Sequence, residues 1–156
     1  MHTATETGTT RHAAAGADRV RVAVAGATGF TGQELLRILS RHPQVSLVAA
    51  TSSGATAARR LPALNHLFKG SIVPLEPESL AGEADVIFLA LPDTAAAELA
   101  LKFSAAGARV IDLSGALRLK DDALRKKWYP ETHVLPEGLA YGLTDRKSTR
   151  LNSSHR

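Results

Sequence analysis

The sequence predicts an α/β fold with a doubly wound, mostly parallel sheet. Three observations support this prediction. Short β-branched and apolar runs alternate with segments of helical periodicity along most of the chain, as in right-handed strand–helix–strand units. Two runs, DVIFLAL at 85–91 and RVIDL at 109–113, are apolar almost throughout, which is typical of strands buried on both faces of a parallel sheet. A glycine-rich turn over 26–32 joins the first run to the first helical segment.

The first strand–helix–strand unit is the clearest. We expect a strand at Arg19–Ala25, where valines alternate with other residues until Gly26 stops the run. A helix is predicted at Glu34–Arg41, with leucines and an isoleucine on one face. His42-Pro43 ends this helix, because the residue before a proline is biased away from the helical region. The second strand is predicted at Gln44–Ala50.

The later elements follow the same alternation after a polar connection over Thr51–Gly70, which can include a short helix. Gly107 stands just beyond an alanine-rich helix, where a glycine commonly ends a helix with positive φ. The predicted elements are a short strand at Ile72–Leu75, a buried strand at Asp85–Leu91, the helix at Thr94–Ala106, a strand at Arg109–Leu113, a charged helix at Asp121–Trp128 stopped near Pro130, and a short strand at Ala140–Leu143.

The chain is expected to hold one domain, over residues 19–144. Residues 1–18 lack an apolar core and a basic start, so they indicate a flexible leader and not a secretory signal. No run of about 18 apolar residues occurs, which argues against a membrane partner. A cytoplasmic location is therefore the default expectation.

The charge and the cysteine count exclude several classes of function. The 19 Lys and Arg and 15 Asp and Glu give a net charge of +4. The last twelve residues hold four of these bases and one acid, so the rest is nearly neutral and no nucleic-acid partner is expected. The chain has no cysteine, hence no disulfide, thiolate metal site or thiol nucleophile, and its six histidines show no metal-ligand spacing.

The carboxyl-terminal residues need a separate interpretation. Asp145–His155, DRKSTRLNSSH, resembles the in-frame translation of a short-read sequencing adapter; a natural basic, serine-rich tail is the alternative. We therefore treat residues 145–156 as a non-native tail and leave them out of the fold prediction. This interpretation predicts that the natural protein continues beyond Thr144.

The glycine-rich turn has the spacing Gly26-x-x-Gly29-x-x-Gly32, one residue longer in its first gap than the usual G-x-G-x-x-G. Gly26 allows a tight exit from the strand, and Gly29 lets a phosphate approach the backbone. Gly32 lets the helix pack close to the sheet. A glycine turn without a ligand is the alternative. The position between a strand and an amphipathic helix favours a dinucleotide site.

The polar groups of this turn suit a pyrophosphate. We expect the backbone amides from Thr28 to Gly32, including those of Phe30 and Thr31, to point at the pyrophosphate. The helix dipole adds partial positive charge. The hydroxyl groups of Thr28 and Thr31 can act as further donors.

The second strand indicates which dinucleotide is bound. A site for NAD usually has Asp or Glu at the end of this strand, to hold the ribose 2′-hydroxyl. Here the strand runs into Thr51-Ser52-Ser53 with no acid. Ser52 and Ser53 can donate to a 2′-phosphate, and Arg59 or Arg60 can neutralise it, although a solvated loop explains the arginine pair equally well. The prediction is a preference for NADP over NAD.

These segments together resemble the semialdehyde dehydrogenase family, and within it the N-acetyl-γ-glutamyl-phosphate reductases, from about Arg19 to Leu143. VAVAGATGFTGQELLRIL matches the family's opening strand, turn and helix, and ADVIFLALP matches the strand before its nicotinamide loop. RVIDLSGALRLKD, WYPETH and AYGL, in that order, are the most specific signal and differ from aspartate-semialdehyde dehydrogenases.

The resemblance implies NADPH-dependent reduction of an acyl phosphate to an aldehyde in arginine biosynthesis, by a homo-oligomer. In this family a cysteine thiolate attacks the acyl phosphate, phosphate leaves, hydride reduces the thioester, and a histidine is the acid–base partner. By resemblance, Gly26–Gly32 bind the pyrophosphate, Ser52 and Ser53 bind the adenosine end, and Leu91 and Pro92 flank the nicotinamide.

Two further positions lie near the expected substrate side. After ALP the family commonly has His-Gly, whereas this chain has Asp93-Thr94. Asp93 is interpreted as a cap of the following helix, with an altered active-site loop as the alternative. In the SGALRLKD stretch, Arg118 is a candidate for binding a substrate phosphate or carboxylate, with a plain surface arginine as the alternative.

The missing cysteine decides what activity to expect. The family's nucleophile would follow shortly after AYGL, so we expect this chain to be an inactive amino-terminal fragment of a reductase. A related acyl-phosphate reductase of lysine biosynthesis and a non-catalytic NAD(P)-binding module remain open. A short-chain dehydrogenase would need a Tyr-x-x-x-Lys pair, which does not occur.

Overall fold

The computed structural model describes residues 19–52, 57–58, 60, 62, 65–66, 68–140 and 142. The leader, Ser53, Arg59 and the tail lie outside the described residues. The described elements are β1 (Val20–Ala25), α1 (Phe30–Leu39), β2 (Val45–Ser52), β3 (Ile72–Pro74), α2 (Pro77–Glu83), β4 (Val86–Leu89), α3 (Asp93–Ala105), β5 (Arg109–Asp112) and α4 (Asp122–Trp128).

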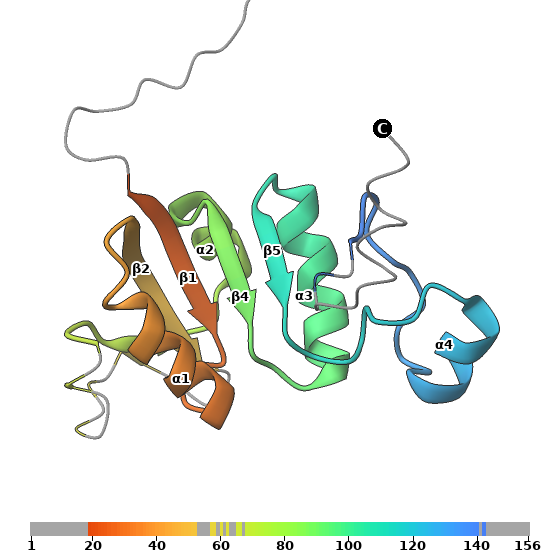
Figure 1. Cartoon of the computed structure of the whole chain (residues 1–156), viewed down its shortest axis with the longest axis horizontal. Helices are drawn as coiled ribbons and strands as arrows, with labels where there is room; N and C mark the ends of the chain where they lie inside the picture. The colour runs from red at the N-terminus through yellow and green to blue at the C-terminus, as the bar shows by residue number, and fades with distance from the viewer. Residues whose placement is uncertain are drawn as a thin grey trace, which may run out of the picture.

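The five strands form one parallel sheet in the order β3-β2-β1-β4-β5. Helix α1 covers one face of the sheet, and α2 and α3 cover the other (Figure 1). This arrangement is a doubly wound, Rossmann-like fold. The predicted fold class is confirmed.

The side chains of β1 alternate between two separate cores, as the strand period of two requires. Val22 and Val24 point to the face covered by α1, where they pack with Leu36 and Leu39 of that helix. Ala23, like Ala25, points to the opposite face and belongs to the larger core beneath α2 and α3. Both faces of β1 are therefore buried, and its two edges are paired with β2 and β4.

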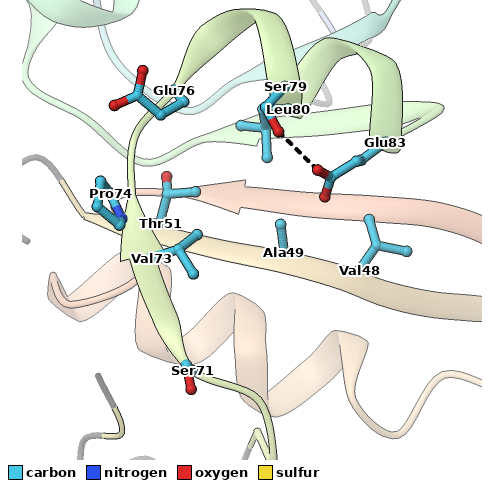
Figure 2. Close-up of a pocket in the computed structure, with 10 residues that line it drawn as sticks. All are labelled: Val48, Ala49, Thr51, Ser71, Val73, Pro74, Glu76, Ser79, Leu80 and Glu83. Atoms are coloured by element: carbon cyan, nitrogen blue, oxygen red, sulfur yellow. Dashed lines mark hydrogen bonds between the residues drawn. The ribbon is translucent and has the colours of Figure 1, made fainter. Parts of the chain in front are cut away.

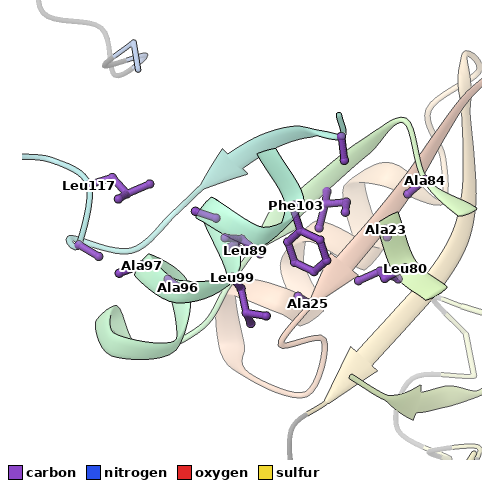
Figure 3. Packing of buried hydrophobic residues seen from close by; sticks show 14 of the residues in the cluster. Ala23, Ala25, Leu80, Ala84, Leu89, Ala96, Ala97, Leu99, Phe103 and Leu117 are labelled. Atoms are coloured by element: carbon purple, nitrogen blue, oxygen red, sulfur yellow. The ribbon is translucent and has the colours of Figure 1, made fainter. Parts of the chain in front are cut away.

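Helix α3 packs closely because its buried face consists mainly of alanines. Ala96, Ala97 and Ala100 leave room for the helix to approach the sheet, and Phe103 fills the space at its carboxyl-terminal half (Figure 3). Gly107 follows the helix with φ of 83°, as predicted for a residue at this position.

Three predictions about elements are wrong or incomplete. Helix α1 begins at Phe30 and not at Glu34, because Gly29 is its N-cap and Gly32 lies in its first turn. Helix α2 was not predicted at all; it is short, and Leu80 is its single buried residue. A strand at 140–143 is not formed at Ala140 or at residue 142, and the other two residues lie outside the described part.

In the part of the chain that the structure describes, no helix has both the length and the apolar character needed to cross a membrane.

Candidate functional site

The carboxyl ends of the five parallel strands meet at one edge of the sheet. The chain winds outward from β1 through β2 to β3, then returns to β4 on the other side of β1. In open α/β sheets the ligand crevice lies outside the strand ends at such a reversal. Here the turn after β1 and the loop after β4 meet at this point.

Gly26 joins these two segments. It has φ of 89°, and a Cβ there would lie 2.2 Å from the carbonyl oxygen of Ala90 and 3.1 Å from Leu91 Cδ2. Its N–H donates to the carbonyl oxygen of Thr51 at 3.0 Å, and Ala27 N–H donates to the same oxygen at 2.9 Å. Only glycine satisfies both the backbone conformation and the contact with the β4 loop.

Gly32 brings α1 against the turn. A Cβ at this buried position would lie 2.1 Å from Gly26 O and 2.7 Å from Ala27 Cα, far inside van der Waals contact. Gly29 is different, since a Cβ there would meet only Gly26 O at an ordinary 3.6 Å. Gly29 is exposed and caps α1, so its missing side chain leaves the outer side of the turn open.

The start of α1 presents backbone donors that have no partner within the helix. The N–H groups of Phe30, Thr31 and Gly32 lie in the first turn of the helix, where no intrahelical acceptor exists. The first turn of α1 holds no acidic residue, so no carboxylate competes for an anion there. One expected donor is otherwise engaged, because Gly29 N–H donates to Gly26 O at 3.2 Å. The side chain of Phe30 is exposed.

The turn is tied to the end of β2 by side chains. Thr28 Oγ1 and Ser52 Oγ lie 3.2 Å apart, and Ser52 is 6% exposed. Gln33 Nε2 donates to the carbonyl oxygen of Thr28 at 2.9 Å, which fixes the peptide before Gly29. The sequence prediction missed Gln33, although its place one residue after Gly32 was visible. Arg60 is exposed.

The loop after β4 forms the other wall. Leu91 is half-buried, and its Cδ2 would lie 3.1 Å from a Cβ at position 26. Pro92 is the N-cap residue of α3. Asp93 does not cap the helix, which corrects the prediction. It is the first helical residue, and its Oδ1 accepts the Gly115 N–H at 2.7 Å. The Asp93 carboxylate therefore connects the β4 loop to the loop after β5.

The loop after β5 is built from local hydrogen bonds. Asp112 accepts the Ser114 N–H and the Ser114 hydroxyl, both at 2.9 Å. The Ser114 hydroxyl oxygen in turn accepts the Ala116 N–H at 3.1 Å. Gly115 lies against the ring of Tyr129, which leaves no space for a Cβ. This loop is held in place on both sides, by Asp93 and by Tyr129.

Arg118 is exposed and follows this loop. It lines a cavity of about 750 Å³ between α3, β5 and residues 136–140 and 142, which Asp112 and Ser114 also line. The structure thus brings Arg118 to the same side of the molecule as the β5 loop. Its backbone N–H donates to Gly115 O at 3.0 Å, so the backbone of Arg118 is held by the loop after β5.

Arg125 of α4 was not singled out in the sequence, yet it holds this region together. It is 7% exposed, and its guanidinium donates to the carbonyl oxygens of Leu119, Lys120 and Thr132 at 3.3, 3.2 and 3.1 Å. It also pairs with Asp122 at 2.7 Å. A hydrogen bond from Lys126 lowers the pKa of Asp122, which keeps this carboxylate ionised.

Among the described residues, no group of three or more His, Cys, Asp and Glu side chains is arranged to hold a metal ion. The groups described at the strand reversal are the backbone N–H groups at the start of α1, the hydroxyls of Thr28 and Ser52, and the side chains of Leu91 and Pro92.

The sheet order and the glycine turn at the strand reversal define a Rossmann-like NAD(P)-binding domain. A family profile described as the semialdehyde dehydrogenase NAD-binding domain matches residues 21–144. The chain belongs to this family.

Curated relatives, including the following two, carry the name N-acetyl-gamma-glutamyl-phosphate reductase. The protein of Geobacter metallireducens is 40% identical over 86% of this chain and 40% of its own length. The protein of Bordetella bronchiseptica is 42% identical over 81% of this chain and 37% of its own length. The chain thus spans about 40% of the length of the curated relatives that it matches.

Two solved structures of aspartate semialdehyde dehydrogenases are similar to this chain in fold. The aspartate semialdehyde dehydrogenase of Candida albicans, determined with NADP, superimposes with a TM-score of 0.56 at 26% identity, over 67% of this chain and 32% of that one. Aspartate semialdehyde dehydrogenase II of Vibrio cholerae, at 21% identity, gives a TM-score of 0.52 over 65% of this chain and 30% of its own, and so supports the fold.

Proposed function

We propose that this chain binds NADP(H) at the turn 26–32 and forms the nucleotide-binding part of a reductase acting on N-acetyl-γ-glutamyl phosphate. The observation that carries the proposal is the pair of close approaches at Gly26 and Gly32, which a Cβ would prevent. They hold the first-turn N–H groups of α1 open toward the strand reversal, where an anion is favoured. The names of the relatives supply the substrate.

The end of β2 favours NADP over NAD. A ribose 2′-hydroxyl is usually held by a carboxylate at this position, whereas β2 ends in Thr51 and Ser52. The Ser52 hydroxyl and the Thr28 hydroxyl form one hydrogen-bonded unit beside the turn. A 2′-phosphate accepts hydrogen bonds from such hydroxyls without repulsion. Ser53 completes this group in the proposal, but lies outside the described residues.

Three segments are proposed to bind the cofactor and the substrate. The amides of residues 30–32 hold the pyrophosphate, Leu91 and Pro92 lie against the nicotinamide, and Arg118 binds the anionic end of the acyl phosphate. Bound NADPH supplies the hydride for the reduction. The protein's part is to orient this cofactor and exclude water from the apolar wall.

The covalent step needs a nucleophile that this chain does not contain. Acyl-phosphate reduction through a thioester requires a thiolate, and the sequence has no cysteine. We therefore infer that the chain alone binds NADP(H) without turning over an acyl phosphate. The missing cysteine also favours the second candidate, a non-catalytic NAD(P)-binding module, as the activity of the chain by itself.

Fluorescence titration of the chain with NADPH and with NADH tests this proposal. Saturable enhancement of nicotinamide fluorescence is expected for NADPH, with weaker binding of NADH. Equal affinity for both would remove the NADP assignment, and no binding of either would remove the cofactor assignment. Reduction of N-acetyl-γ-glutamyl phosphate by the isolated chain would contradict the inference from the missing thiol.

A further inference from the structure

A second cavity, of about 280 Å³, lies between α2 and the two outer strands β2 and β3. Figure 2 shows α2 on one side of these strands and α1 on the other, so the cavity is on the face opposite α1. The proposed cofactor crevice does not include it. The ten residues that line it are Val48, Ala49, Thr51, Ser71, Val73, Pro74, Glu76, Ser79, Leu80 and Glu83.

The hydroxyl group of Thr51 lies at the bottom of this cavity. Thr51 is 1% exposed, and no described residue forms a hydrogen bond with its Oγ1. Figure 2 shows this oxygen pointing from β2 toward α2. Buried hydroxyl groups are nearly always hydrogen-bonded, because leaving one without a partner destabilises the folded state. The cavity is therefore where a partner for Thr51 belongs.

The charge around the cavity favours a cationic occupant. Glu76 and Glu83 are exposed at its rim, and none of the ten lining residues is Lys, Arg or His. Ser79 Oγ donates to Glu83 Oε1 at 2.8 Å, which orients this carboxylate beneath α2 (Figure 2). Glu83 is also the last residue of α2, where the helix carbonyl groups disfavour a negative charge. A bound cation would offset the charge of the two carboxylates and the unfavourable interaction of Glu83 with the end of the helix.

The volume of the cavity and the residues that line it limit the size and the chemistry of the ligand. Since a water molecule occupies about 30 Å³ in the liquid, the cavity holds several waters or one compact organic molecule. Val48, Val73 and Leu80 provide apolar contact for a short hydrocarbon chain. We propose that this cavity binds a compact organic cation, an ammonium or guanidinium on a short alkyl chain, through Thr51 Oγ1 and the carboxylate of Glu83.

The test uses the full chain, with n-butylguanidinium as the probe and n-butanol as the uncharged control. Titration at constant ionic strength is followed by amide NMR. Saturable shifts are expected at residues 49–51 and 79–83 with n-butylguanidinium, and none with n-butanol. Glu83→Gln, which keeps the acceptor for Ser79, is expected to weaken probe binding about fivefold. Glu78→Gln, on α2 but outside the cavity lining, is expected to leave it unchanged.

Thr51→Val provides a second, independent readout. It is expected to weaken probe binding about fivefold and to raise the unfolding temperature, because it removes a buried hydroxyl that lacks a protein partner. A lowered unfolding temperature with unchanged probe binding would overturn the assignment of Thr51. Equal shifts with n-butanol, or equal affinities for wild type and Glu83→Gln, would overturn the cation site, as would the absence of saturable shifts. These outcomes are independent of whether the chain binds NADP(H).

Discussion

The side-chain oxygens of Thr28 and Ser52 lie 3.2 Å apart, so the turn after β1 is hydrogen-bonded to the end of β2. The contact joins two parts of the proposed cofactor site that are 24 residues apart in the chain. It places a hydroxyl pair beside the first turn of α1. The selectivity of the site for a 2′-phosphate is therefore expected to depend on Ser52.

Replacing Ser52 with alanine removes this hydroxyl. We expect NADPH affinity to fall about tenfold, because hydrogen bonds to a charged phosphate are stronger than neutral ones. NADH affinity should fall much less, since NADH lacks the 2′-phosphate. Fluorescence titration measures both, and Ser46→Ala at the opposite end of β2 is the control. Equal losses for the two coenzymes would show that Ser52 does not contact the 2′-phosphate.

Alanine at Gly32 places a Cβ 2.1 Å from Gly26 O. The helix and the turn must separate, so we expect the free energy of unfolding to fall by about 1–3 kcal/mol and NADPH binding to be lost. Urea unfolding and the titration measure these two effects. Gly82→Ala is the matched control, because a Cβ there meets nothing within 4 Å and alanine favours the helix. A Gly32→Ala protein that binds NADPH normally contradicts the site.

Asp93→Ala removes the acceptor for the Gly115 N–H. We expect the Gly115 amide to exchange its hydrogen faster, and the free energy of unfolding to fall by about 1 kcal/mol. Asp93→Asn keeps an acceptor oxygen and should lie between wild type and the alanine variant. Hydrogen exchange followed by NMR gives the comparison. Unchanged exchange in Asp93→Ala would mean that the β5 loop is held without this contact.

Arg125→Met keeps the apolar volume of the side chain but removes donors to three carbonyl oxygens. We expect a loss of about 3 kcal/mol in unfolding free energy, because these groups and Asp122 lose a shared buried partner. Lys126→Met removes an exposed charge from the same helix and is expected to cost about 0.5 kcal/mol or less. Chemical denaturation distinguishes the two; similar small losses would contradict the role given to Arg125.

The sequence predicts the sheet well, because strand alternation, apolar runs and glycine turns are local signals. It predicts α1 poorly at its start, since Phe30 and Gly32 carry no apolar periodicity. The sequence signal for helix α2 is limited to Pro77 at its first position and Glu78 in its first turn. A short helix with one buried residue offers little else to detect.

The site was predictable only in part. Glycine spacing identifies Gly26 and Gly32, because each role depends on a conformation or a contact that a Cβ prevents. The contact of Asp93 with Gly115 spans 22 residues and depends on the order of the strands. Arg125 lies in a charged segment that resembles a solvated helix face, and its burial follows only from the loops that fold around it.

The backbone amides at the start of α1 are proposed to hold the diphosphate of the cofactor. Amide NMR of the full chain, titrated with NADP⁺, tests this proposal most directly. We expect the largest saturable shifts at residues 28–32, with smaller ones at Ser52 and Leu91. Shifts confined to other parts of the sheet, or no saturable shifts at residues 28–32, would contradict it.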